Sequence, residues 1–103
     1  MRREYALRLT IYGRALNRVM IDAHYELKHS EVMNDPVILD LVRGLNGKTY
    51  EHESVTSEGW EIHVNDPLYL GQQPYRLVWC LHPDESYIGI INAFRRSYGK
   101  IPE

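Results

Sequence analysis

The sequence predicts an α+β domain of two layers, with a mainly antiparallel sheet and one or two helices packed on one face. Three observations lead to this fold class. The 103 residues are enough for one modest core but not for two. Segments rich in aromatic and β-branched residues occur towards both ends of the chain, and a helical stripe lies between them. We therefore expect residues 1–103 to form a single α+β domain.

The first 21 residues predict a β-hairpin. Between Glu4 and Tyr12, apolar side chains alternate with polar or small ones, which is the period of a half-buried strand. Gly13 permits a turn, and residues 15–21 continue as a second strand.

Two helices are predicted to follow this hairpin. The first is a short helical turn over residues 23–29, which Asp22 can cap. The second begins at Asp35, an N-cap type of residue, and Pro36 occupies the first helical position, where its missing N–H costs nothing. Apolar residues then recur at helical spacing until Gly44 and Gly47 end the helix.

Four further strands are expected in the second half of the chain. Residues 48–55 and 60–64 form a hairpin, in which Glu61 and His63 lie on the face opposite Trp60. The run Asn65-Asp66-Pro67 is expected to break the second strand, with a connecting loop over residues 68–74. Residues 75–81 and 87–94 form the last hairpin, over a polar turn at residues 82–86.

The composition is that of an ordinary globular protein, with 44% hydrophobic and 25% charged residues. No apolar run approaches the roughly 20 residues that span a bilayer, and the N-terminus lacks the apolar core of a signal peptide. The one cysteine, Cys80, excludes an internal disulfide and is expected to be a buried apolar residue. These features predict a cytoplasmic protein without a membrane partner.

Charge is distributed unevenly along the chain. Residues 1–20 carry five arginines against one glutamate, and residues 67–103 carry four basic residues against three acids. Residues 21–66 carry ten acids against three basic residues. If the two cationic zones pair as neighbouring strands, they form one basic surface suited to a phosphate backbone. Alternatively, these arginines neutralise the acidic middle of the chain within the fold.

The last hairpin also carries a recognisable pattern. One strand begins Pro74-Tyr75-Arg76, the turn contains Asp84-Glu85, and the second strand runs through residues 88–94 into Arg95-Arg96. The predicted first helix carries His24, Lys28 and His29 within residues 24–29. This order of short helices and an antiparallel sheet resembles the RelE/ParE toxin superfamily, and the wider group of small microbial ribonuclease-like domains that includes the BrnT toxins.

The resemblance implies RNA binding or metal-independent RNA cleavage, with no cofactor, and RNA and a cognate antitoxin-like protein as partners. It implies phosphate contacts by arginine, because a guanidinium matches phosphate geometry with paired donors. The implied catalytic residues are Arg76, Arg95, His24 and Tyr98. The implied nucleic-acid-binding residues are Arg96, Asn92, Lys28, His29 and Lys100.

Each of these residues also has a structural interpretation. Arg76 could form an ion pair with an acid on a neighbouring strand, such as Glu61, and Arg95 and Arg96 could be a solvated strand end. Asn92 could satisfy a backbone group at a sheet end. The alternative function is a non-catalytic protein-interaction module of the same fold, favoured by the acidic residues between 51 and 58, and an exposed sheet edge would allow a dimer.

No metal site is expected. His52 and His63 can meet across a hairpin, but no third and fourth ligand is evident, and both are expected to be surface histidines.

Overall fold

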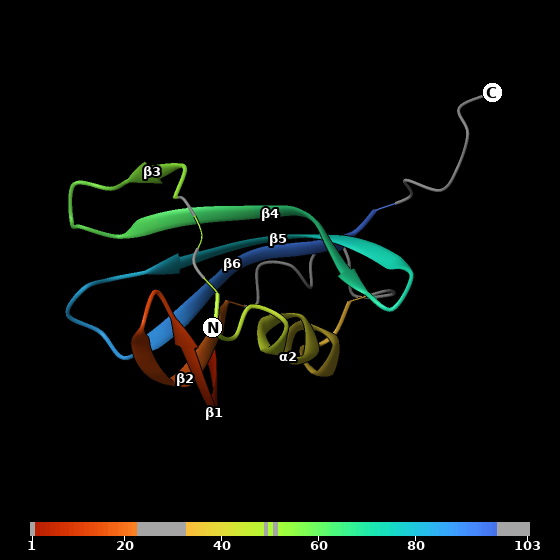
Figure 1. The fold of residues 1–103 in the computed structure, drawn as a ribbon, viewed down its shortest axis with the longest axis horizontal. Coiled ribbons are helices and arrows are strands. Elements are labelled where there is room, and N and C mark those ends of the chain that lie inside the picture. Colours follow the sequence, from red (N-terminus) through yellow and green to blue (C-terminus); the bar gives the residue numbers. More distant parts are fainter. Residues whose placement is uncertain (1, 23–32, 49, 51, 97–103) are drawn as a thin grey trace.

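The computed structural model of the chain describes residues 2–22, 33–48, 50 and 52–96, which form one six-stranded mixed sheet and a single helix (Figure 1). This part of the chain is mostly sheet, rather than a sheet under a layer of two helices. The predicted helix over residues 23–29 lies outside the described residues. The elements are β1 (Arg2–Ile11), β2 (Arg14–Asp22), α2 (Asp35–Arg43), β3 (Ser54–Val55), β4 (Glu61–Leu70), β5 (Gln73–Leu81) and β6 (Tyr87–Arg95).

The strands lie in the order β1-β2-β6-β5-β4-β3. Of the five pairings among these described strands, four are antiparallel, which confirms the predicted mainly antiparallel sheet. The exception is the parallel pair of β2 and β6, which makes the sheet mixed. This pair places the first hairpin directly beside the last strand of the chain.

The first hairpin closes through a two-residue turn of Tyr12 and Gly13, since Ile11 pairs with Arg14. Both turn residues have positive φ, at 58° and 73°. Such turns need this backbone conformation because it matches the twist of the flanking strands. Glycine adopts it readily, whereas a bulky aromatic residue such as Tyr12 rarely does.

Helix α2 starts one residue earlier than predicted, because Asn34 rather than Asp35 is its N-cap. The Asn34 side chain accepts a hydrogen bond from the Val37 N–H at 3.0 Å. The Asp35 carboxylate instead accepts hydrogen bonds from Arg3, at 2.5 and 2.8 Å, and from the Tyr5 hydroxyl. Asp35 therefore ties the helix to β1. The apolar stripe packs into the core as predicted, through Ile38, Leu41 and Val42.

Two predictions about the middle strands are wrong. The run Asn65-Asp66-Pro67 does not break its strand, because β4 continues to Leu70 through a bulge that contains a cis peptide bond before Pro67. Residues 68–74 are therefore not a loop: Leu68–Leu70 pair with β5, and the turn is at Gly71-Gln72. Among the described residues of the preceding predicted strand, over residues 48–55, the strand β3 comprises Ser54–Val55.

The two faces of the sheet differ, as β5 shows most clearly. Tyr75, Leu77, Trp79 and Leu81 are buried on the face that α2 covers (Figure 1). Arg76, Val78 and Cys80 point to the other face, which no described helix covers, and all three are partly exposed. We call this second side the open face. The prediction that Cys80 is a buried core residue is therefore wrong.

The burial of β4 reverses another expectation. His63 lies on the face opposite Trp60, as predicted, but that face is the core, and only 1% of His63 is exposed.

Among the described residues, no helix is long and apolar enough to cross a membrane.

Candidate functional site

Two of the predicted arginines converge on the open face. Arg76 on β5 pairs in register with Phe94 on β6, and its guanidinium carbon lies 6.0 Å from the centre of the Phe94 ring. The guanidinium carbon of Arg96 lies 5.5 Å from the same ring. Asp66 contacts both cations, at 3.1 Å from Arg76 and 3.4 Å from Arg96. We call these four residues the arginine cluster.

Arg76 does form an ion pair with an acid on a neighbouring strand, as its structural interpretation expects, but that acid is not Glu61. Its partner is Asp66, whereas Glu61 pairs with Arg14 at 3.0 Å. The bulge in β4 opposite Arg76 accounts for the difference, since it places Asp66 beside the β5 arginine.

The other predicted site residues do not all reach this cluster. Asn92 pairs with Val78, and its side chain accepts a hydrogen bond from the Ala93 N–H at 2.9 Å, as its structural interpretation anticipated. Arg95 pairs with Tyr75 and points to the opposite side of the sheet from Arg76, because successive strand residues alternate faces. His24, Lys28, His29, Tyr98 and Lys100 lie outside the described residues.

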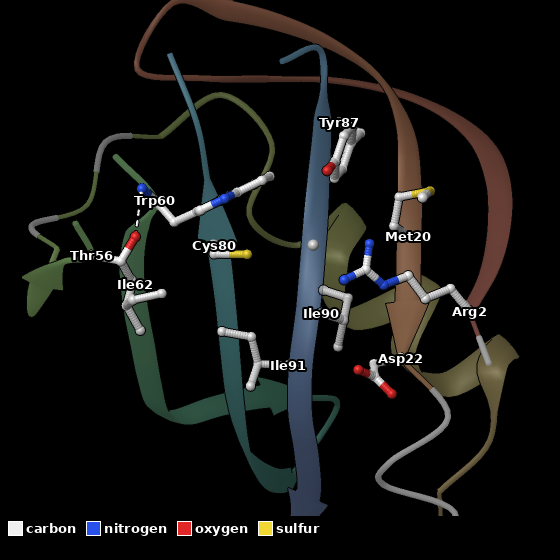
Figure 2. A pocket seen from close by; sticks show the side chains of 11 residues that line it. Arg2, Met20, Asp22, Thr56, Trp60, Ile62, Cys80, Tyr87, Ile90 and Ile91 are labelled. Carbon is white, nitrogen blue, oxygen red and sulfur yellow. Dashed lines mark hydrogen bonds between the residues drawn. The ribbon is translucent and has the colours of Figure 1, made fainter. Parts of the chain in front are cut away.

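A trough of about 280 Å³ continues along the open face, lined by residues of β1, β2, β4, β5 and β6 and of the segment before β4 (Figure 2). Thr56, Trp60 and Ile62 lie on its β4 side. Arg2, Met20 and Asp22 lie on its β2 side, where the Arg2 guanidinium reaches over β2 towards β6. Cys80, Tyr87, Gly89, Ile90 and Ile91 complete the lining.

The aromatic wall of the trough is held by ring contacts. The Trp60 ring lies 5.0 Å from the His82 ring and 5.8 Å from the Tyr87 ring, measured between centres. The backbone N–H of Trp60 donates to Thr56 Oγ1 at 3.0 Å. Burial raises the pKa of the Tyr87 hydroxyl above its ordinary value.

Gly89 leaves space in the floor of the trough for the Cys80 thiol. A Cβ atom at residue 89 would lie 2.8 Å from Cys80 Sγ, closer than van der Waals contact permits. Figure 2 shows the thiol between β5 and β6. Burial raises the pKa of Cys80, so the thiol is neutral near pH 7 and forms part of an apolar surface.

The trough and the arginine cluster lie on the same face. Cys80 and Arg76 are four residues apart on β5, which corresponds to roughly 13 Å along a strand. A further cation, Arg18, lies 5.3 Å above the Tyr87 ring at the trough end. The open face therefore offers an aromatic-walled recess and several guanidinium groups.

The charge distribution fits each interpretation of the sequence in part. β2 and β6, one strand from each cationic zone, are neighbours, and Arg18 is the cation within their paired residues. Arginines from both zones also pair with acids, as in Arg3–Asp35, Arg14–Glu61 and Arg76–Asp66. The acidic middle is thus partly neutralised within the fold.

Fold and site together define a class: a small mixed-sheet domain with an aromatic trough and an arginine cluster on its uncovered face. Comparisons of the chain with family models, with curated proteins and with solved structures found no match. The resemblance to the RelE/ParE superfamily therefore stays a prediction from the sequence.

Proposed function

We propose that this domain binds single-stranded RNA on the open face of its sheet. The observation that carries the proposal is the arginine cluster, in which two guanidinium groups from β5 and the end of β6 flank one phenyl ring. Single-stranded RNA is recognised mainly by stacking of unpaired bases on aromatic rings and by cationic contacts to the backbone. The open face supplies both kinds of group.

The trough adds a recess for a base. Trp60 and Tyr87 give it flat aromatic walls, and Ile62 and Met20 give it apolar sides. A base bound in the trough leaves the phosphates on either side within reach of arginines. Arg2 and Arg18 lie beside the trough, and Arg76 lies beyond it along β5.

The ion pairs with Asp66 do not prevent phosphate binding. The Arg76 and Arg96 side chains are 36% and 34% exposed, so their contacts with Asp66 are accessible to competing anions. Asp66 itself is only 15% exposed, so it stays beside the two guanidinium groups when a ligand binds. A phosphate can therefore share the exposed guanidinium groups with the Asp66 carboxylate.

The proposal is tested by fluorescence anisotropy with a labelled single-stranded RNA of eight nucleotides. We expect Arg76→Ala and Arg96→Ala each to weaken binding roughly tenfold, and to reduce the dependence of affinity on salt. Arg43→Ala is the matched control, because Arg43 also forms an exposed ion pair with an aspartate, Asp40, but on α2. Equal affinities for all three variants, or no RNA binding by the unchanged protein, would refute the proposal.

The apolar lining of the trough favours a second candidate, a non-catalytic protein-interaction module with an antitoxin-like partner. In that case the trough accommodates an apolar side chain of the partner. Salt separates the two candidates, because RNA binding weakens steeply with salt whereas an apolar contact does not.

A further inference from the structure

One histidine joins the two turns beside the aromatic wall of the trough. His82 begins the turn between β5 and β6, where its carbonyl oxygen accepts a hydrogen bond from the Glu85 N–H at 3.1 Å. Its side chain is only 18% exposed, and its ring packs against Trp60 with 5.0 Å between ring centres. His82 therefore supports a residue that lines the trough.

Both nitrogens of the His82 ring contact backbone groups of fixed polarity. Nδ1 lies 3.1 Å from the backbone nitrogen of Asp84, and it is the acceptor because a backbone N–H can only donate. Nε2 lies 2.8 Å from the carbonyl oxygen of Glu58, which can only accept, so Nε2 carries the proton. Only a neutral imidazole has one donor and one acceptor, so these two contacts select the neutral ring.

The turn before β4 leaves space for this ring. A Cβ atom at residue 59 would lie 3.0 Å from His82 Nε2, which is closer than side chains normally pack. Gly59 also has a φ of 94°, a conformation that residues with a side chain rarely adopt. The close contact between the imidazole and the Glu58 carbonyl therefore depends on glycine at residue 59.

The same turn holds the Trp60 backbone. The Thr56 N–H donates to the Trp60 carbonyl oxygen at 2.8 Å, and Thr56 Oγ1 accepts from the backbone N–H of Trp60 at 3.0 Å. Thr56 and Trp60 both line the trough. The hydrogen bond from His82 to Glu58 thus links the β5–β6 turn to the aromatic wall.

Charged groups near His82 come from both turns. The Asp84 carboxylate is 4.0 Å from Nδ1 and 87% exposed, and Glu58 and Glu85 are exposed as well. A proton on Nδ1 would face the Asp84 N–H, which is also a donor, so this hydrogen bond would be lost. The acceptor within reach of the protonated nitrogen is the Asp84 carboxylate. Protonation therefore favours movement of the ring towards Asp84 and away from Glu58.

The other neighbours of the ring give protonation no further acceptor. Trp60 contributes an indole, and the Tyr87 ring lies beyond it, at 5.8 Å from the Trp60 ring. The nearby cation, Arg18 on β2, lies 5.3 Å above the Tyr87 ring. A second positive charge on His82 gains nothing from Arg18.

We propose that His82 is a positioning residue for the trough, and that RNA binding there requires its neutral form. The neutral ring holds the turn before β4 and the Trp60 ring in place, and the protonated ring releases them. Because a histidine changes its charge between about pH 5 and 8, RNA binding to the open face weakens as the pH falls through this range. This inference rests on the proposed RNA binding and adds its regulation by pH.

The expected direction is opposite to that of simple electrostatic attraction. A histidine that gains a proton adds a positive charge, which by itself strengthens binding to a phosphate backbone. Weaker binding at low pH therefore indicates that protonation changes the shape of the site.

The test is fluorescence anisotropy with a labelled oligouridylate octamer at about pH 7.5 and about pH 5.5, at constant ionic strength. Uracil neither gains nor loses a proton in this range, so the base itself does not titrate. We expect the affinity of the unchanged protein to fall about fivefold at the lower pH, which corresponds to the loss of one hydrogen bond. Circular dichroism at both pH values checks folding.

Two matched variants assign the effect. His82→Gln keeps an N–H that can donate to Glu58 but has no titratable group, so it should bind RNA equally at both pH values. His52→Gln is the control, because His52 is an exposed histidine whose ring contacts the buried His63 on the covered side of the sheet. It should keep the fivefold change.

Nitrogen NMR of the His82 imidazole tests the tautomer without RNA. At about pH 7.5 we expect a protonated Nε2 and an unprotonated Nδ1. The opposite tautomer would overturn the inference, and this measurement does not depend on the folding of any variant.

The inference can fail separately from the proposed function. RNA binding that depends on Arg76 and Arg96 but is equal at both pH values overturns the inference and leaves the open-face proposal in place. So does a pH effect that persists in His82→Gln or disappears in His52→Gln. An absence of RNA binding at either pH refutes the open-face proposal and this inference together.

Discussion

Arg76 shows what a single residue reveals in the sequence and what it does not. An arginine within an apolar strand needs a partner, because an unpaired buried charge is costly. One of the two interpretations of Arg76 in the sequence therefore places an acid beside it. The identity of that acid depends on the bulge at Asp66-Pro67, which shifts the register of β4 against β5. Because the same residues resemble a strand break, Asp66 could not be chosen over Glu61.

The burial of His63 and Cys80 is the reverse of what the sequence predicts, for a related reason: His63 is buried and Cys80 is partly exposed. Each lies on a strand of alternating burial, and the sequence does not state which of the two faces α2 covers. Because α2 packs on the Trp79 side, His63 enters the core and Cys80 lines the trough.

The rate at which the Cys80 thiol is modified can measure how accessible the trough is. Burial raises its pKa above the ordinary value of 9.0, although a backbone hydrogen bond from Gly89 opposes the rise. Since the thiolate is the reactive form, we expect iodoacetamide to modify the folded protein more slowly than the urea-unfolded protein near pH 7. Saturating single-stranded RNA should slow the reaction further. Mass spectrometry follows the modification, and equal rates in the folded and unfolded protein would contradict this prediction.

The same pKa shift gives the direction of a stability change. A thiol with a raised pKa in the folded state stabilises the fold fully below about pH 9, where both states are protonated. This contribution is lost as the pH rises through the pKa of the folded state. The free energy of unfolding should therefore fall above about pH 9, and less so in Cys80→Ala. An identical alkaline profile for the variant would show that the thiol does not contribute.

At the scale of elements, the hairpins and the helix follow from local patterns. Alternating apolar residues predict β1 and β2, and helical spacing predicts α2. The continuation of β4 past Pro67 is different, because it depends on the position of the strand in the sheet. β3 pairs with β4 only at Glu61 and Ile62. Beyond Ile62, no described strand pairs with the outer edge of β4. Pro67 lies in this part of β4, where the absence of a proline N–H breaks no hydrogen bond to a described strand.

The start of α2 gives a test at this scale. Asn34→Ala removes the capping side chain and should lower the free energy of unfolding by about 1 kcal/mol. Asp35→Ala removes the acceptor that Arg3 and Tyr5 share, and should cost more, about 2–3 kcal/mol. Urea unfolding measures both. A larger loss for Asn34→Ala would contradict the assigned roles.

At the scale of the whole molecule, the open face depends on a pairing that local patterns do not contain. β2 and β6 are far apart in sequence, and their parallel pairing places the Met20 side of the trough beside Gly89. The sequence indicated Arg76, Arg95 and Arg96 as candidate phosphate-binding residues. Of these, Arg76 and Arg96 converge on the Phe94 ring. The trough was not evident, because its walls come from five strands whose order is set by the complete sheet.

The central claim is that RNA binds the open face, and mapping of backbone amide NMR shifts tests it most directly. On titration of the isotope-labelled protein with a single-stranded RNA octamer, we expect the largest changes at Arg76, Val78, Cys80, Gly89 and Phe94. Amides of α2, on the covered face, should change little. Unchanged spectra, or changes centred on α2, would contradict the claim.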